Sequence, residues 1–193
     1  MAIDPGTDTL GRTVIDLDMV TLDATIRDVA TENASWLVRR NVTYQEVEYW
    51  HGARAARLTA LSDTLLAQMR YWRPHLVASE SPFMGRRANA YEALVEAMVM
   101  LRQTYAQYDQ HRAIELVTPP EAKVAVGVRS KDWKKKEATQ EAIARLLAAP
   151  AIHQLHYHAQ VPYETLDEHS IDAISVGYCK VNEARQYLRH RGA

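Results

Sequence analysis

Short apolar stretches separated by turn residues occupy the first thirty positions of the chain. Ala2 and Ile3 lead into Asp4-Pro5-Gly6, a turn sequence in which proline fixes one backbone angle and glycine permits the left-handed conformation. β-Branched residues are interleaved with polar ones over 9–18 and again over 21–30. The pattern predicts three strands, which we expect to form an antiparallel meander.

The next stretch changes to a helical period. Between residues 47 and 72, apolar side chains recur every three or four positions, apart from one gap at Arg54. Thr43, with Glu46 three residues later, has the form of a capping box, and Pro74 cannot continue a helix. One long helix that ends before Pro74 is therefore predicted.

Helical and strand-like segments alternate over the rest of the chain. Short apolar runs at 75–81 and 113–119 predict strands, and helical patterns occur at 87–109, at 137–148 and from Glu168 onward. Strands separated by helices favour parallel pairing in this second half. The expected fold class is α/β: a mixed five-stranded sheet, its first three strands antiparallel and the remainder parallel, flanked by helices.

The helix predicted at 87–109 carries a continuous apolar seam. Its members are Tyr91, Leu94, Met98, Leu101, Tyr105 and Tyr108. Such a seam either packs on the protein's own sheet or takes part in a two-fold dimer.

Length and composition describe one globular domain. The chain has 193 residues, 47% of them apolar and 24% charged, which excludes a disordered or low-complexity protein. No apolar run approaches the roughly 18 residues of a membrane helix, and the first residues lack the pattern of a signal peptide. Cys179 is the only cysteine, so no intrachain disulfide can form, and a reducing, cytoplasmic compartment is expected.

The charge is distributed unevenly, although the formal net charge is only −1. Nine acidic residues and four Lys or Arg precede position 49, whereas residues 123–145 hold seven basic and three acidic residues. The densest basic stretch is RSKDWKKKEA at 129–138. It is either a solvated loop that leads into a helix or a loop that contacts phosphates.

Three carboxylates and one histidine have the pattern of a metal site. Asp4 ends the first predicted strand and Glu80 the fourth, while Asp172 lies in the first turn of the last helix, with His169 three residues before it. Taken singly, Asp4 could be an ordinary turn residue, Glu80 an exposed strand end, and Asp172 a charge that complements the helix dipole. If the first and fourth strands are neighbours, the carboxylates meet and repel one another unless a cation intervenes. Such oxygen ligands suit Mg²⁺ or Mn²⁺, and two of these ions support phosphodiester cleavage.

Four motifs, in order along the chain, resemble those of the RuvC-type Holliday-junction resolvases within the RNase H-like nuclease superfamily. The first is IDPGTDTLG at 3–11, and the second is ASESPFMGRRANAYEALVEA at 78–97. The lysine-rich third region corresponds to TPPEAKVAVGVRSKDWKKKEATQEAIARLL at 118–147, and the fourth motif to HSIDAISVGYCK at 169–180. The resemblance therefore covers nearly the whole chain.

The resemblance implies an activity and a set of site residues. The activity is metal-dependent endonuclease cleavage that resolves four-way DNA junctions by symmetric paired nicks, as in DNA recombination and repair. Two Mg²⁺ or Mn²⁺ ions per site would be held by the catalytic residues Asp4, Glu80, His169 and Asp172. The implied DNA-binding residues, of which Phe83 would stack on a base and the basic ones would contact phosphates, are Phe83, Arg86, Arg87, Asn89, Lys123, Lys134, Lys135 and Lys136.

The resemblance also implies an organisation of the molecule. It implies one nuclease domain over 1–193, with an insertion at 151–166, and a homodimer, because symmetric cleavage needs two sites related by a dyad. His153, His156 and His158 in the insertion lack a fourth zinc ligand. We therefore expect this segment to be a polar loop packed against the domain.

Other functions fit parts of the pattern. A broader nuclease acting on forks or flaps would carry the same motifs, whereas a non-catalytic junction-binding protein has no need of the complete carboxylate set. IDPGT alone also occurs in actin-like ATPases, but that fold needs two such domains and this chain has room for one. The expected partner is branched DNA, chiefly four-way junctions, and no association with a membrane is expected. The expected source is a bacterial cell or its phage.

Overall fold

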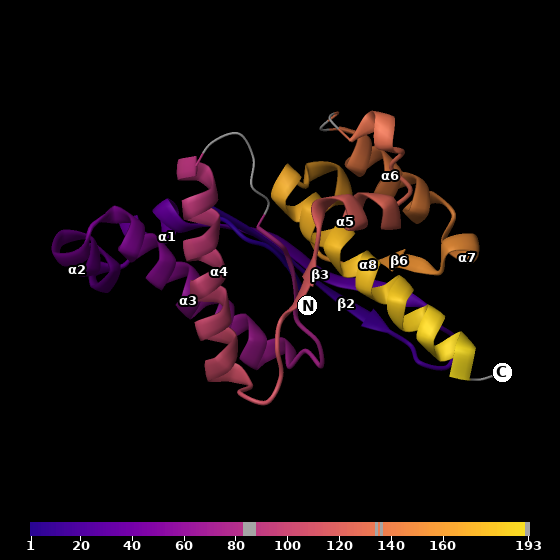
Figure 1. Ribbon diagram of the computed structural model, residues 1–193, viewed down its shortest axis with the longest axis horizontal. Coiled ribbons are helices and arrows are strands. Elements are labelled where there is room, and N and C mark those ends of the chain that lie inside the picture. The colour runs from indigo at the N-terminus through magenta and orange to yellow at the C-terminus, as the bar shows by residue number, and fades with distance from the viewer. Residues whose placement is uncertain (83–87, 134, 136, 192–193) are drawn as a thin grey trace.

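Among the residues that the structure describes, six strands form one mixed sheet in the computed structural model (Figure 1). The structure describes residues 1–82, 88–133, 135 and 137–191, with the backbone alone at 88–90. The strand order across the sheet is β5-β4-β1-β2-β3-β6. In chain order the strands are β1 (Ala2–Asp4), β2 (Thr9–Leu17), β3 (Ala24–Asn33), β4 (Ala78–Glu80), β5 (Glu115–Val117) and β6 (Leu155–Tyr157).

The strand pairing confirms the predicted mixed α/β sheet. The first three strands pair antiparallel, and β4 and β5 continue from β1 in parallel. The prediction of five strands misses β6, which lies within the segment 151–166 and pairs in parallel with the outer edge of β3. Polar and histidine residues around Leu155–Tyr157 led to the expectation of a polar loop there, and the strand is revealed by its pairing with β3.

Helices cover both faces of the sheet, and strand alternation divides the core between them. On one face Ile3 packs with residues of α3 and α4, and on the other Ala2 packs beneath α8, with α5 and α6 packed on α8. Figure 1 shows α1 to α4 at one end of the molecule and α5 to α8 at the other. The helices are α1 (Ala34–Arg40), α2 (Val42–His51), α3 (Ala53–Trp72), α4 (Ala88–Tyr108), α5 (Pro119–Ala125), α6 (Glu137–Ala148), α7 (Pro150–His153) and α8 (Glu168–Arg191), with short 3₁₀ turns η1 (Ser130–Asp132) and η2 (Tyr163–Thr165).

The prediction of a single long helix before Pro74 is wrong, because the helix is interrupted at Gly52. Gly52 has φ +86°, a conformation that an α-helix does not contain, and it separates α2 from α3. The predicted capping box at Thr43 is also absent. Instead, Asn41 caps α2, and its side chain accepts a hydrogen bond from the backbone N–H of Thr43.

The apolar seam of α4 packs on the protein's own core, which was the first of the two expectations for it. Met98, Leu101 and Tyr105 are buried against α3 and the sheet. Val95 and Val99 lie on a different side of α4 and are exposed. None of the described helices is both long and apolar enough to span a membrane.

Candidate active site

Asp4 and Glu80 lie side by side because β1 and β4 are neighbours. The two strands run parallel with Ala2 opposite Ala78 and Ile3 opposite Ser79, so their last residues fall at the same edge of the sheet. Side chains alternate along each strand, which places Asp4 on the face that α8 covers. The adjacency expected from the sequence is therefore confirmed.

The N-terminal turn of α8 is held over this edge by polar contacts. The Asp167 side chain accepts a hydrogen bond from the backbone N–H of Ser170 and another from the Thr31 hydroxyl on β3. Thr31 also bonds to the Ser170 hydroxyl, at 2.8 Å. These contacts tie the start of the helix to the sheet and bring His169 and Asp172 above the two strand ends.

Gly11 allows α8 to approach β2 closely at this point. A Cβ atom placed on Gly11 would lie 2.1 Å from the backbone oxygen of His169, a separation that no real Cβ contact shows. Because Gly11 has no side chain, the backbone of His169 can pack directly against β2.

Short contacts join His169 to Asp4 and to Thr9. His169 Nδ1 lies 2.8 Å from Asp4 Oδ2, and His169 Nε2 lies 2.8 Å from Thr9 Oγ1. The Glu80 carboxyl group lies close enough to that of Asp4 for Asp4 to raise the pKa of Glu80. The charges of Asp4 and Asp172 both act on Glu80, so three acidic groups share one partly enclosed space.

Burial and mutual repulsion disturb the protonation of this cluster. Burial, followed by the charge of Asp4, raises the pKa of Glu80 to about 8 and that of Asp172 to about 6. The hydrogen bond to Asp4 raises the pKa of His169 above its usual range. Carboxyl groups held in this way bind protons or cations readily near neutral pH, which is typical of functional sites.

The donor set of the cluster suits a hard divalent cation. Within the described residues, no three His, Cys, Asp or Glu side chains are already arranged to hold a metal ion. The carboxyl group of Asp4 instead contacts His169 and lies beside that of Glu80. Their crowding is the kind that a cation relieves, and carboxylate oxygens are the ligands that Mg²⁺ and Mn²⁺ prefer.

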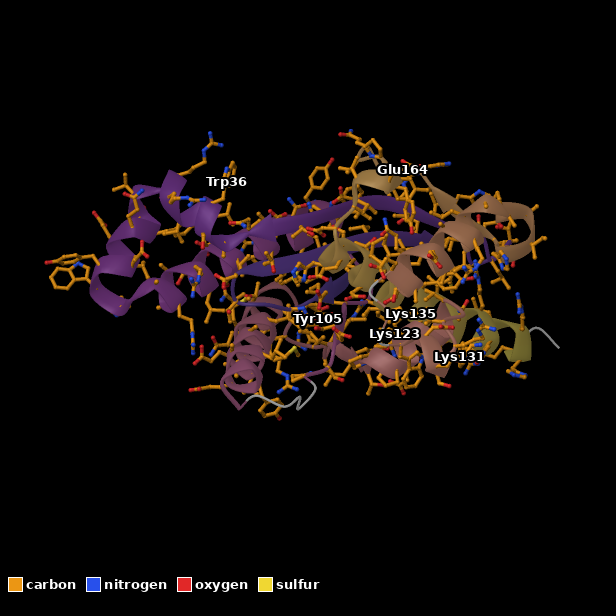
Figure 2. All side chains as sticks on the ribbon, turned by 90° about the horizontal axis from the view of Figure 1, so that it is seen from above. Trp36, Tyr105, Lys123, Lys131, Lys135 and Glu164 are labelled. Carbon is orange, nitrogen blue, oxygen red and sulfur yellow. The ribbon has the colours of Figure 1, made fainter. Side chains whose placement is uncertain are left out.

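A cleft of about 400 Å³ opens from Asp172 between α6 and α8. Lys123 of α5 and Lys135 line it, and Figure 2 shows the two lysines close together, far from Trp36. Lys123 donates a hydrogen bond to the backbone oxygen of Trp133, and Lys135 forms an ion pair with Asp132. Two of the basic residues expected to contact DNA therefore lie beside the carboxylate cluster.

The remaining predicted DNA-binding residues fall outside the described part of the chain. Phe83, Arg86, Arg87, Lys134 and Lys136 are not described, and of Asn89 only the backbone in α4 is. Their roles stay predictions.

The three histidines of the segment 151–166 do not form a metal centre with other described residues. His156 and His158 have ring centroids 6.4 Å apart, and His156 Nε2 lies 3.8 Å from Asp23 Oδ1. The segment itself contains β6 and the end of α7 rather than an unstructured loop.

Sequence reasoning missed Thr9, Trp133 and the helix α5 that carries Lys123. Thr9 reads as an ordinary strand residue, and nothing local connects it to a histidine 160 positions away. The signal for α5 was present, because Thr118 and Glu121 form a complete capping box before Lys123.

Comparison with known proteins identifies the fold. The sequence matches no protein-family model and, at a significant level, no curated protein. Thermus thermophilus RuvC in complex with a Holliday junction superposes with a TM-score of 0.62 at 18% identity, covering 96% of this chain and 93% of that one. The yeast mitochondrial Holliday junction resolvase Ydc2 superposes with a TM-score of 0.65 at 12% identity, covering 98% of this chain and 79% of that one. The fowlpox virus resolvase bound to Holliday junction DNA superposes with a TM-score of 0.54 at 7% identity, covering 94% of this chain and 97% of that one. The chain therefore has the fold of RuvC and related resolvases, as the motifs indicated.

Proposed function

We propose that this protein is a metal-dependent endonuclease that resolves four-way DNA junctions. The observation that carries the proposal is the gathering of Asp4, Glu80 and Asp172 at one sheet edge, within a fold shared with Holliday junction resolvases. A partly buried cluster of three carboxyl groups is costly to a protein that does not use it, because each charge disfavours the next.

The carboxylates of Asp4, Glu80 and Asp172 would hold two Mg²⁺ or Mn²⁺ ions, with His169 as a further ligand. Such ions activate water and stabilise the leaving oxygen in phosphodiester hydrolysis. Glu80 must give up its proton to act as a ligand, and its pKa of about 8 places that change near neutral pH. Without a cation, His169 Nδ1 contacts Asp4 Oδ2, and ligation through Nδ1 would replace that contact.

The lysines beside the cluster would receive the DNA backbone. Lys123 and Lys135 line the cleft that begins at Asp172, so a strand lying in the cleft would bring its phosphates to the carboxylates. Phosphate contacts of this kind set affinity and its salt dependence rather than sequence choice.

Symmetric, paired nicks would require a homodimer. A four-way junction presents two equivalent strands, so two active sites related by a dyad are needed to cut both. The exposed side of α4, with Val95 and Val99, offers an apolar surface that does not take part in the protein's own core.

Replacing Asp4 by Asn tests the proposal. The variant keeps the shape of the side chain but removes the charge, so junction binding should persist while cleavage falls more than about 100-fold, beyond the ~10–100-fold effect of losing a supporting contact. The measurement is cleavage of an end-labelled four-way junction with Mg²⁺ or Mn²⁺, beside a gel-shift assay of binding. Asp16→Asn, at an exposed position paired with Arg27, is the matched control and should cut normally.

Several outcomes would contradict the proposal. If Asp4→Asn cuts as fast as the wild type, the carboxylates do not carry the chemistry. If the wild type cuts forks and flaps as well as junctions, the protein is a broader structure-selective nuclease. Junction binding without cleavage in either metal would identify a non-catalytic binding protein.

A further inference from the structure

The imidazole of His169 is held from both of its nitrogens. Nδ1 faces Asp4 Oδ2 at 2.8 Å, and Nε2 faces Thr9 Oγ1, also at 2.8 Å. The two contacts lie on opposite sides of the ring, so only one nitrogen points toward the carboxylate cluster. The other points toward a neutral hydroxyl on β2.

The two partners of the ring differ in what they can exchange with it. A neutral imidazole carries a proton on one nitrogen and a lone pair on the other. A threonine hydroxyl can accept the N–H, which leaves the lone pair on the opposite nitrogen. Without a cation, Nδ1 lies 2.8 Å from the Asp4 carboxylate, a contact in which a proton is shared between the two groups. If Thr9 accepts the Nε2–H, a cation that displaces this proton meets the Nδ1 lone pair on the side where Asp4, Glu80 and Asp172 lie.

We propose that Thr9 is a positioning residue, which accepts the Nε2–H of His169 so that Nδ1 is the nitrogen directed at a bound divalent cation. The proposal rests on the proposed function and deepens it. Histidine ligands of metals regularly donate their second N–H to an oxygen acceptor, which sets both the tautomer and the ring orientation. Among the described residues, Thr9 is the group that contacts Nε2.

The surroundings of Thr9 make it a firm support. A β-branched side chain has few χ1 choices, and Thr9 pairs with Asn33 in the β2–β3 ladder. The His169 backbone rests on Gly11 of the same strand. One strand therefore fixes both the main chain and the ring of His169, although the histidine side chain is one-third exposed.

The affinity for Mn²⁺ without DNA, measured by calorimetry, tests this role. Thr9→Val keeps the side-chain shape but cannot accept the N–H, and we expect affinity to fall about 10–100-fold. Thr9→Ser retains the hydroxyl and should bind Mn²⁺ like the wild type. Thr13 lies on the same strand as Thr9, and its hydroxyl donates a hydrogen bond to the Asp28 carbonyl of β3. Thr13→Val removes that hydroxyl and should lower stability without changing Mn²⁺ affinity.

The His169→Ala background separates positioning from general damage. If Thr9 acts through His169, Thr9→Val has no further effect once the ring is absent. With Mg²⁺ bound, ¹H–¹⁵N spectra of the histidine rings should show the Nε2–H tautomer of His169 in the wild type and in Thr9→Ser, and lose it in Thr9→Val.

The outcomes distinguish this inference from the proposed function. Normal Mn²⁺ affinity in Thr9→Val, or an Nδ1–H tautomer in the Mg²⁺-bound wild type, overturns the role of Thr9 and leaves the nuclease proposal intact. A wild-type protein that binds no Mn²⁺ overturns both.

Discussion

At the scale of single residues, the site is governed by how three acidic groups share one buried edge. Glu80 is the most disturbed of them, since burial and the charges of Asp4 and Asp172 all oppose its ionisation. Lys123 acts in the opposite direction but does not compensate. The cluster therefore stores electrostatic strain whenever it is ionised and holds no cation.

This strain predicts a pH-dependent stability in the absence of divalent cations. The pKa of Glu80 is raised from 4.5 to about 8, so the folded state binds this proton more tightly than the unfolded chain. The stabilisation is complete below pH 4.5 and is lost as pH rises toward 8. Glu80→Gln, which is neutral throughout, should match the wild type at the low end and exceed it at pH 8 by on the order of 3 kcal/mol.

Urea unfolding in EDTA at several pH values measures this difference. Asp172, with a pKa raised to about 6, is present in both proteins, so the comparison measures Glu80 together with its repulsion by Asp4 and Asp172. An unfolding free energy that differs by the same amount at pH 5 and pH 8 would show that Glu80 is not the responsible group.

At the scale of elements, the site depends on how closely α8 lies on the sheet. Two glycines provide the space: Gly11 on β2 faces the His169 backbone, and Gly177 in α8 faces Ile15, Ala2 and Thr13. The obstacles differ in kind. A Cβ added at Gly11 would meet main-chain atoms of His169, which cannot rotate away. A Cβ added at Gly177 would lie 2.8 Å from Cδ1 of Ile15, the end of a flexible side chain.

Gly11→Ala should therefore displace the start of α8 and with it His169. We expect a loss of about 1–3 kcal/mol in unfolding free energy from overpacking, together with loss of junction cleavage. Gly177→Ala is the matched comparison: helix propensity gains about 1 kcal/mol and offsets much of the crowding. Chemical denaturation and cleavage assays on both variants check this, and equal effects at the two positions would contradict it.

At the scale of the whole molecule, the sheet separates a helical half built from α1 to α4 from the half that carries α5 to α8 (Figure 1). The carboxylate cluster lies on the α8 face. The outward side of α4 exposes Val95 to 39% and Val99 to 47%. A dimer formed through this side of α4 would leave the α8 face of each copy open to DNA.

Val95→Glu combined with Val99→Glu should give a monomer, because two new charges would be buried in an apolar contact. Light scattering after gel filtration measures the mass, and wild type is expected to be dimeric. Val20→Glu, at a turn position that is 91% exposed, is the control and should leave the mass unchanged. A wild-type monomer, or a dimeric double variant, would exclude this interface.

Much of the fold and of the candidate site could be predicted from the sequence where neighbouring residues decide the outcome. Asp4 and Glu80 stand at strand ends marked by turn residues, and His169 and Asp172 share a helix face because they are three residues apart. Predictions failed where local patterns were ambiguous. The helical period ran through Gly52, whose positive φ breaks the helix, and β6 lies in a polar, histidine-rich segment that was expected to be a loop.

By itself, the sequence determined the order of the first five strands and of the main helices between them, the acidic and histidine residues of the site, and the basic stretch near it. Only the tertiary structure decided that Thr9 meets His169 from 160 positions away, that Gly11 receives the backbone of α8, and that the pKa of Glu80 rises to about 8. The physical reason is range. Backbone periodicity and turn chemistry act over a few residues, whereas burial, charge repulsion and close packing exist only once the sheet and its helices enclose a common space.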